Sequence, residues 1–115
     1  MASLLNSTKG SQVVFDLKQA KTFWPRLIGL WGRSEISDAE GLWIHRCNSI
    51  HTWWMQFPID CIFLDSELRV KRVVENVKPW RLIMPVWGAK SVIEVKAGLS
   101  ESKKIEVGDQ LHVGD

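Results

Sequence analysis

The chain has no tyrosine and only two cysteines, although it has seven tryptophans. It has no run of about 18 apolar residues, the length that a membrane-spanning helix needs. Its first residues also lack the basic start and apolar core of a secretory signal. Two cysteines in such a chain are typical of reduced, buried thiols and not of a disulfide framework. We therefore expect a cytoplasmic protein in which Cys47 and Cys61 are free thiols.

An excess of charge of one sign is missing as well. The 15 Lys and Arg residues are mixed along the chain with 13 Asp and Glu residues, and the formal net charge is only +2. This balance predicts neither a nucleic acid nor an anionic membrane as a partner. A length of 115 residues with 45% hydrophobic content, and no repeat or linker, predicts a single domain that spans residues 1–115.

Short apolar runs between turn-forming residues predict a β-rich chain. Residues 4–6 and 13–17 flank a turn that ends at Gly10, and they predict an opening hairpin. The alternation of apolar and polar residues slips near Arg72, which indicates a β-bulge. Residues 79–88, with two prolines and two tryptophans, predict an irregular crossing. Further strands are predicted at 41–44, 59–64, 68–77, 93–97 and 110–113, with one helical turn at 100–104.

Residues 22–31 predict the main helix. Phe23, Leu27 and Trp31 repeat at positions i, i+4 and i+8 and make an apolar face. Gly29 inside this segment would let another backbone approach closely. The predicted fold class is therefore mainly β (α+β), a compact, antiparallel, barrel-like sheet of about seven short strands with one main helix packed on one side.

The nearly unbroken apolar run 59–64 predicts a strand that is covered on both faces. Asp60 interrupts this run, and a carboxylate in that place needs compensating partners. These partners can be backbone donors or an arginine, for which the candidates are Arg26, Arg33 and Arg81. We expect Asp60 to anchor the fold in this way.

His51 and Asp60 are the pair that could form a catalytic dyad, because a carboxylate orients an imidazole and raises its basicity. A turn at 56–58 between two paired strands would set His51 opposite Phe63, on the other face from Asp60. This register favours structural roles for both residues. A hydrolytic or lytic enzyme that uses His51 and Asp60 is the alternative.

The spacing of His45, Cys47 and His51, with Cys61 as a fourth ligand, suggests a zinc or copper site. Two-residue steps along an extended strand are nearly 7 Å long, too far for adjacent ligands unless the chain bends. We therefore expect no metal and no cofactor.

The aromatic residues suggest a ligand surface. Trp53, Trp54, Met55, Trp80 and Trp87 could form a platform for a small molecule. The leading hypothesis is a small, non-enzymatic ligand-binding or interaction domain, a monomer or weak homodimer, whose partner is an unknown small molecule or protein. The residues expected at its ligand-binding surface are His51, Thr52, Trp54, Met55, Asp60, Trp80 and Arg81.

The order of motifs resembles the bacterial and archaeal family called domain of unknown function 192. The resemblance covers about nine tenths of the chain and implies a compact, mainly β fold without an established activity. The residues that carry it are Arg26, Gly29-Leu30, Gly32-Arg33, Cys47, Ile50-His51-Thr52, Met55, Pro58-Ile59-Asp60, Phe63-Leu64-Asp65, Val70, Pro79-Trp80-Arg81, Ala89, 92–94, Ala97-Gly98 and Gly108-Asp109.

Overall fold

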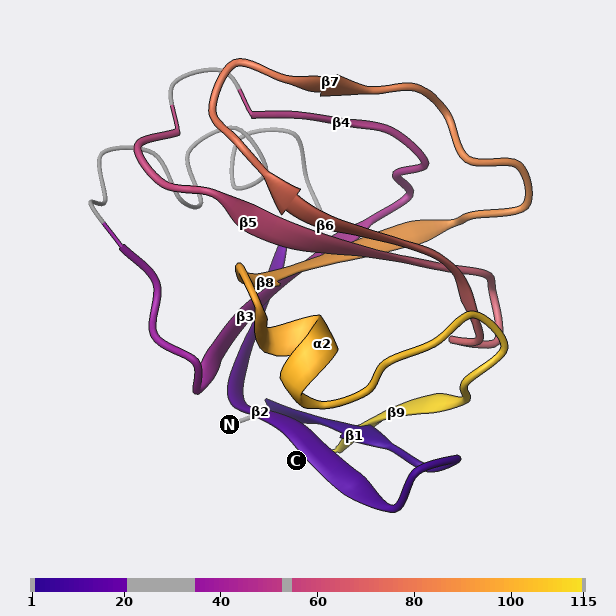
Figure 1. Cartoon of the computed structure of the whole chain (residues 1–115). Coiled ribbons are helices and arrows are strands. Elements are labelled where there is room, and N and C mark those ends of the chain that lie inside the picture. The colour runs from indigo at the N-terminus through magenta and orange to yellow at the C-terminus, as the bar shows by residue number, and fades with distance from the viewer. Residues whose placement is uncertain (1, 21–34, 53–54, 115) are drawn as a thin grey trace.

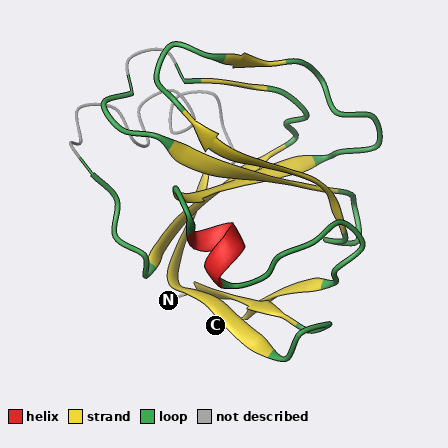
Figure 2. Cartoon of the chain, in the orientation of Figure 1, coloured by secondary structure: helices red, strands yellow, loops and turns green. Residues whose placement is uncertain are grey.

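The computed structural model describes residues 2–20, 35–52 and 55–114. This part of the chain forms nine strands and one short helix (Figure 2), which confirms the mainly β fold class. The helix predicted at 22–31, with Gly29, lies outside the described residues. The elements are β1 (Ala2–Asn6), β2 (Ser11–Ala20), β3 (Glu40–His45), β4 (Ile50–His51), β5 (Ile59–Leu64), β6 (Val70–Val77), β7 (Leu82–Ile83), β8 (Ser91–Lys96), α2 (Leu99–Ser102) and β9 (Leu111–Gly114).

Seven strands form one curled sheet in the order β6-β5-β8-β3-β2-β1-β9 (Figure 1). The two edge strands, β6 and β9, meet at one end. There, Arg69 and Gln110 form an isolated β-bridge, and the Val70 N–H donates to the Asp109 carbonyl oxygen at 2.9 Å. The sheet is therefore a barrel that is closed only in part. Its neighbouring strands are antiparallel, apart from the parallel pair β2 and β3. A parallel pair needs a crossover of about a dozen residues or more, and the chain between β2 and β3 is long enough to supply it.

The predicted opening hairpin is confirmed. Strands β1 and β2 pair with Asn6 opposite Ser11, and Gly10 in the turn has a φ of 68°, which glycine adopts without steric cost. The other edge of β1 pairs with β9, where Leu4 lies opposite Val113. The two ends of the described chain therefore lie side by side in the sheet (Figure 1).

Strand β5 is buried along its whole length, so the prediction that it is covered on both faces is confirmed. Ile62 and Leu64 point into the barrel, whereas Ile59, Cys61 and Phe63 point to the outer face. The barrel core consists of Leu4, Val13, Val14, Leu17, Ile62, Leu64, Val70, Ile93, Val95, Leu99, Ile105 and Leu111. The outer core consists of Ile36, Leu42, Ile44, Cys47, Ile50, Met55, Phe57, Ile59, Cys61, Phe63, Val77, Ile83, Val86, Ala89 and Val92.

A second layer covers the outer core, built from the two-stranded sheet of β4 and β7 with its flanking segments. Ile50, Met55, Phe57, Ile83 and Val86 point from this layer into the outer core. Figure 1 shows it at the top of the molecule, over β5, β6 and β8. We call this layer the outer ribbon; its described residues are 46–52, 55–58 and 78–90.

The prediction that His51 lies opposite Phe63 across a turn at 56–58 is wrong. Strand β5 pairs with β6 and β8, whereas β4 pairs with β7 and sets His51 opposite Leu82. Both edges of β5 are thus occupied by other strands. The chain that precedes β5 therefore stacks over its outer face, where it buries apolar side chains, instead of lying beside it.

The local predictions around this region are confirmed. Phe63 lies opposite Arg72 while Leu64 lies opposite Val70, so one extra residue forms the bulge. Strand β8 and helix α2 occur where a strand and a helical turn are predicted, and 79–88 holds only the short strand β7. In the described part of the chain no helix is long and apolar enough to cross a membrane.

Candidate interaction surface

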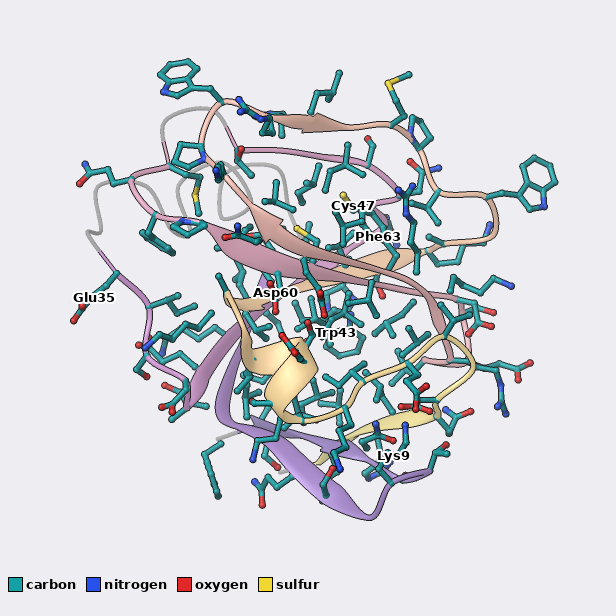
Figure 3. All side chains as sticks on the ribbon, viewed as in Figure 1. Lys9, Glu35, Trp43, Cys47, Asp60 and Phe63 are labelled. Atoms are coloured by element: carbon teal, nitrogen blue, oxygen red, sulfur yellow. The ribbon has the colours of Figure 1, made fainter. Side chains whose placement is uncertain are left out.

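Asp60 is fully buried on β5, beside the start of α2 (Figure 3). Its Oδ2 accepts hydrogen bonds from the N–H groups of Gly98 (3.0 Å) and Ser100 (3.1 Å) and from the Ser100 hydroxyl (2.6 Å). Its Oδ1 accepts a hydrogen bond from the Asn76 N–H at 2.8 Å. The carboxylate therefore ties β5 to β6 and α2. Its described partners are three backbone N–H groups and one hydroxyl. Arg81, a predicted partner, is not among them.

His51 and Asp60 are not brought together. His51 is exposed on β4, in the layer that packs on the face of β5 from which Cys61 projects. Asp60 precedes Cys61 on the strand and therefore projects from the opposite face. The sheet separates the two side chains, so the structure does not support the dyad. Arg26 and Arg33, the other predicted partners of Asp60, lie outside the described residues.

His45, Cys47 and His51 are also spread over the structure. The His45 ring packs against Trp43 in a tilted arrangement with ring centroids 4.0 Å apart, and its Nε2 lies 3.2 Å from the Gln19 Oε1. Cys47 is buried in the outer core, whereas His51 is exposed on β4. No three His, Cys, Asp or Glu side chains within residues 2–20, 35–52 and 55–114 are grouped so that they could hold a metal ion.

Cys47 and Cys61 are free thiols, as predicted, and both are buried in the outer core. The Cys47 Sγ donates to the Ser49 carbonyl oxygen at 2.7 Å. Burial raises the pKa of the Cys61 thiol well above its usual value, and the nearby groups of Glu94, Asp60 and Cys47 raise it further. Because the thiolate is the reactive form, Cys61 is suited to packing and not to nucleophilic chemistry.

Thr52 is fully buried and joins β4 to the segment that precedes β7. Its hydroxyl donates to the Lys78 carbonyl oxygen at 2.6 Å and accepts from the Arg81 N–H at 2.9 Å. These are the two groups that a β-turn over 78–81 would ordinarily join directly. The Thr52 backbone adds a bond to the Arg81 carbonyl oxygen (2.9 Å) and one from the Trp80 N–H (3.1 Å). Thr52 therefore fixes the shape of this turn.

Trp80 has a φ of 64°, a left-handed conformation that is uncommon outside glycine. It follows Pro79, and a type II turn with proline at its first central position requires a positive φ at the next residue. A bulky side chain there costs of order 1–3 kcal/mol and persists only where the surroundings hold it. The contacts of Thr52 provide that support. The turn thus keeps a tryptophan at the surface, where the residue is 55% exposed.

Four large apolar residues of the outer ribbon are exposed. We call them the apolar strip, which consists of Trp80 (55% exposed), Leu82 (59%), Met84 (66%) and Trp87 (94%). Ile83 and Val86, which alternate with them, are buried in the outer core. In the described residues only Phe15 and Val107 are large hydrophobic residues of comparable exposure. Contiguous exposed apolar surface marks interaction sites more often than scattered exposed residues do, and four such residues within positions 80–87 of one layer make this segment a candidate.

The charges on the outer ribbon have one sign. Neither 46–59 nor 76–90 contains an Asp or Glu, although the whole chain has 13. The basic residues of the outer ribbon are all exposed, and they are Arg46, Lys78, Arg81 and Lys90. The apolar strip therefore lies on a layer that is basic and free of acidic side chains.

Two hollows flank α2, with volumes of about 360 and 290 Å³. Phe15 and Leu99 line the first, and Asp60, Glu75 and Glu101 line the second. Neither hollow includes a residue of the apolar strip. The carboxylate of Asp60 is already engaged by its hydrogen bonds, so the second hollow offers no prepared catalytic group. The apolar strip is therefore the stronger candidate for a functional surface.

The predicted ligand-binding residues divide into three groups. Trp54 lies outside the described residues. Those exposed on the outer ribbon are His51, Trp80 and Arg81. Those that are buried are Thr52, Met55 and Asp60.

Sequence analysis missed Leu82 and Met84, which lie in the middle of the apolar strip. It also missed Lys78 and Lys90 as part of the same surface. One signal was available, because two runs of more than a dozen residues each lack any acidic side chain. Neither run shows on its own that the two would fold into one layer.

The curled sheet and its outer ribbon define a small, mainly β domain. Family membership follows from the model of DUF192, described as an uncharacterized ACR, which matches residues 4–113. The chain therefore belongs to the DUF192 family, and the resemblance seen in the sequence is confirmed.

The similar proteins described below carry a family name only or are of unknown function. A UPF0127 protein of Thermococcus sibiricus is 36% identical over 112 residues, which cover 94% of this chain and 72% of the relative. A UPF0127 protein of Pyrococcus furiosus is 34% identical over 113 residues, covering 94% and 95%. The crystal structure of a protein of unknown function from Novosphingobium aromaticivorans superimposes with a TM-score of 0.82 at 24% identity, over 96% of this chain and 82% of the other. These comparisons indicate the fold but no specific function.

Proposed function

We propose that this protein is a non-enzymatic interaction domain that works in the cytoplasm and binds its partner through the apolar strip. The observation that carries the proposal is the turn at 78–81. There, a buried threonine holds Trp80 at the surface in a conformation that sterics disfavour. Backbone strain of this kind is concentrated at functional sites. Two free, buried thiols support a reducing compartment.

The alternative, a hydrolytic or lytic enzyme, has less support. It requires His51 to act with Asp60, and these residues lie on opposite sides of the sheet. All of the described hydrogen bonds of Asp60 connect it to neighbouring strands and α2, so its role is explained by the fold.

A fluorescent dye tests the proposed surface. Anilinonaphthalene sulfonate is apolar and anionic, and it becomes fluorescent when it binds exposed apolar surface. We expect the variant Leu82→Ser/Met84→Ser to lose most of the dye fluorescence of the native wild-type protein. The matched control is Phe15→Ser/Val107→Ser, since these residues are 60% and 67% exposed, close to the 59% and 66% of Leu82 and Met84.

Unfolding curves for both variants check that they are folded before the dye is added. Retention of the signal in the control with loss in the strip variant supports the proposal. An equal loss in both variants, or a larger loss in the control, would show that the apolar strip is not the preferred contact surface.

A further inference from the structure

We infer that the partner of the apolar strip is the surface of an anionic lipid bilayer, an inference that rests on the proposed function. The side chains of the strip enter the headgroup region. The basic residues Arg46, Lys78, Arg81 and Lys90 contact the anionic headgroups. Such lipids are enriched on the cytoplasmic face of membranes, the compartment proposed above.

The composition of the apolar strip fits the boundary between headgroups and acyl chains. Tryptophan is enriched at this depth because its ring is amphipathic, and Trp80 and Trp87 bracket the strip. Leu82 and Met84 between them are aliphatic and more than half exposed. Protein segments that lie on a membrane combine such apolar residues with lysine and arginine on the flanking surface.

The positive charge of the outer ribbon favours an anionic partner. Its basic side chains have no acidic neighbours within 46–59 or 76–90. Acidic groups gather elsewhere, as at the turn before β9, where Glu106 and Asp109 contact Lys9. A second copy of the chain docked strip to strip would bring like charges together, which disfavours a homodimer as the occupant.

The same charge could attract a single-stranded nucleic acid, and the chemistry of the strip decides between the two partners. Nucleic-acid platforms use aromatic rings on which successive bases stack, along a basic groove. Here aliphatic side chains occupy the middle of the strip, where a base would gain no stacking. The outer ribbon is also the outermost layer at the top of the molecule as drawn in Figure 1.

The even mixture of charges along the sequence predicts no anionic membrane as a partner. That prediction treats the surface as uniform. Folding instead brings two acid-free runs into one layer, so the local charge of this layer differs from the net charge of +2. The proposed contact with lipid is peripheral. In the described part of the chain no helix is long and apolar enough to cross the bilayer.

Co-sedimentation of the whole protein with lipid vesicles tests the inference. We expect binding to vesicles in which about a third of the phosphatidylcholine is replaced by phosphatidylglycerol, little binding to pure phosphatidylcholine, and weaker binding at high salt. Lys78→Gln/Lys90→Gln should lower the partition coefficient about 25-fold, since each lysine near an anionic surface contributes roughly fivefold. Lys96→Gln/Lys104→Gln changes the net charge equally at exposed positions outside the ribbon and should have little effect.

Several results would overturn the inference. They are equal binding to neutral and anionic vesicles, equal effects of the two lysine pairs, and preferential binding of a fluorescent single-stranded oligonucleotide. Absence of vesicle binding would also overturn it, while the dye experiment on Leu82 and Met84 would still decide the proposed function separately. Loss of anionic vesicle binding in Leu82→Ser/Met84→Ser, with binding kept in Phe15→Ser/Val107→Ser, would support both.

Discussion

Replacing Asp60 by asparagine tests whether this buried carboxylate anchors the fold. The side chain serves four donors, three at Oδ2 and one at Oδ1. Asparagine has nearly the same shape but only one accepting oxygen. If that oxygen occupies the place of Oδ2, the new amide N–H₂ faces the Asn76 N–H, and a buried donor loses its acceptor.

The cost follows from the hydrogen bonds. An unsatisfied buried donor costs about 1–3 kcal/mol, and bonds to a charged acceptor stabilise about twice as much as neutral ones. Avoiding the burial of a charge offsets part of this loss. We expect Asp60→Asn to lower the free energy of unfolding by about 3 kcal/mol, a large share of the roughly 5–15 kcal/mol of a typical domain. Asp60→Ala, which removes every acceptor, should cost more.

Urea denaturation measures these differences, with Ser100→Ala as a graded comparison. Ser100→Ala removes only the hydroxyl donor and leaves three backbone donors on the carboxylate, so we expect a loss of about 1 kcal/mol. The predicted order of stability is wild type, Ser100→Ala, Asp60→Asn, Asp60→Ala. Unchanged or increased stability of Asp60→Asn would refute the anchoring role and favour a role for Asp60 in binding or catalysis.

Three further predictions follow from single side chains. Thr52→Val keeps the side-chain volume but leaves the Lys78 carbonyl and the Arg81 N–H without their hydroxyl partner, so the free energy of unfolding should fall by about 1–3 kcal/mol. Thr52→Ser keeps the hydroxyl and should lose less than half as much. Equal losses in the two variants would mean that the hydroxyl is unimportant. Burial raises the pKa of Asp109, but hydrogen bonds from Asn6, the Glu106 N–H and Lys9 outweigh it, so the net pKa is lowered. A carboxyl group whose pKa is lowered in the folded state stabilises that state at pH values above its unfolded pKa, and this contribution is lost as the pH falls. The free energy of unfolding should therefore drop more steeply below about pH 4 in the wild type than in Asp109→Asn. Cys61 should react with iodoacetamide only as fast as the protein unfolds, and rapid labelling under native conditions would contradict its burial.

The strands that sequence analysis predicts correctly are those with a long or clear pattern. Residues 59–64 form an apolar run that requires cover on both faces, and the structure supplies the barrel core and the outer core. The β-bulge near Arg72 was also predictable, because the alternation of apolar and polar residues along an eight-residue strand shows where one extra residue is inserted. Local sequence pattern carries this information directly.

The pairing of β4 and the extent of the candidate surface were not predictable in the same way. Strands β4 and β7 are two residues long, too short to show any period. Their position depends on which apolar side chains can cover the outer face of β5, a tertiary contact between distant segments. The exposure of Leu82 and Met84 likewise depends on Ile83 and Val86 taking the places in the outer core.

The most direct test of the binding surface uses an environment-sensitive fluorophore on single introduced cysteines. Met84→Cys and Val107→Cys place the label at positions with 66% and 67% exposure, on the apolar strip and at the acidic turn before β9. The native cysteines are buried, so labelling is selective. On addition of anionic vesicles, we predict a blue shift and stronger emission from the label at position 84 and no change from the label at position 107. Equal responses at both positions, or a response only at position 107, would contradict the claim that the outer ribbon is the binding surface.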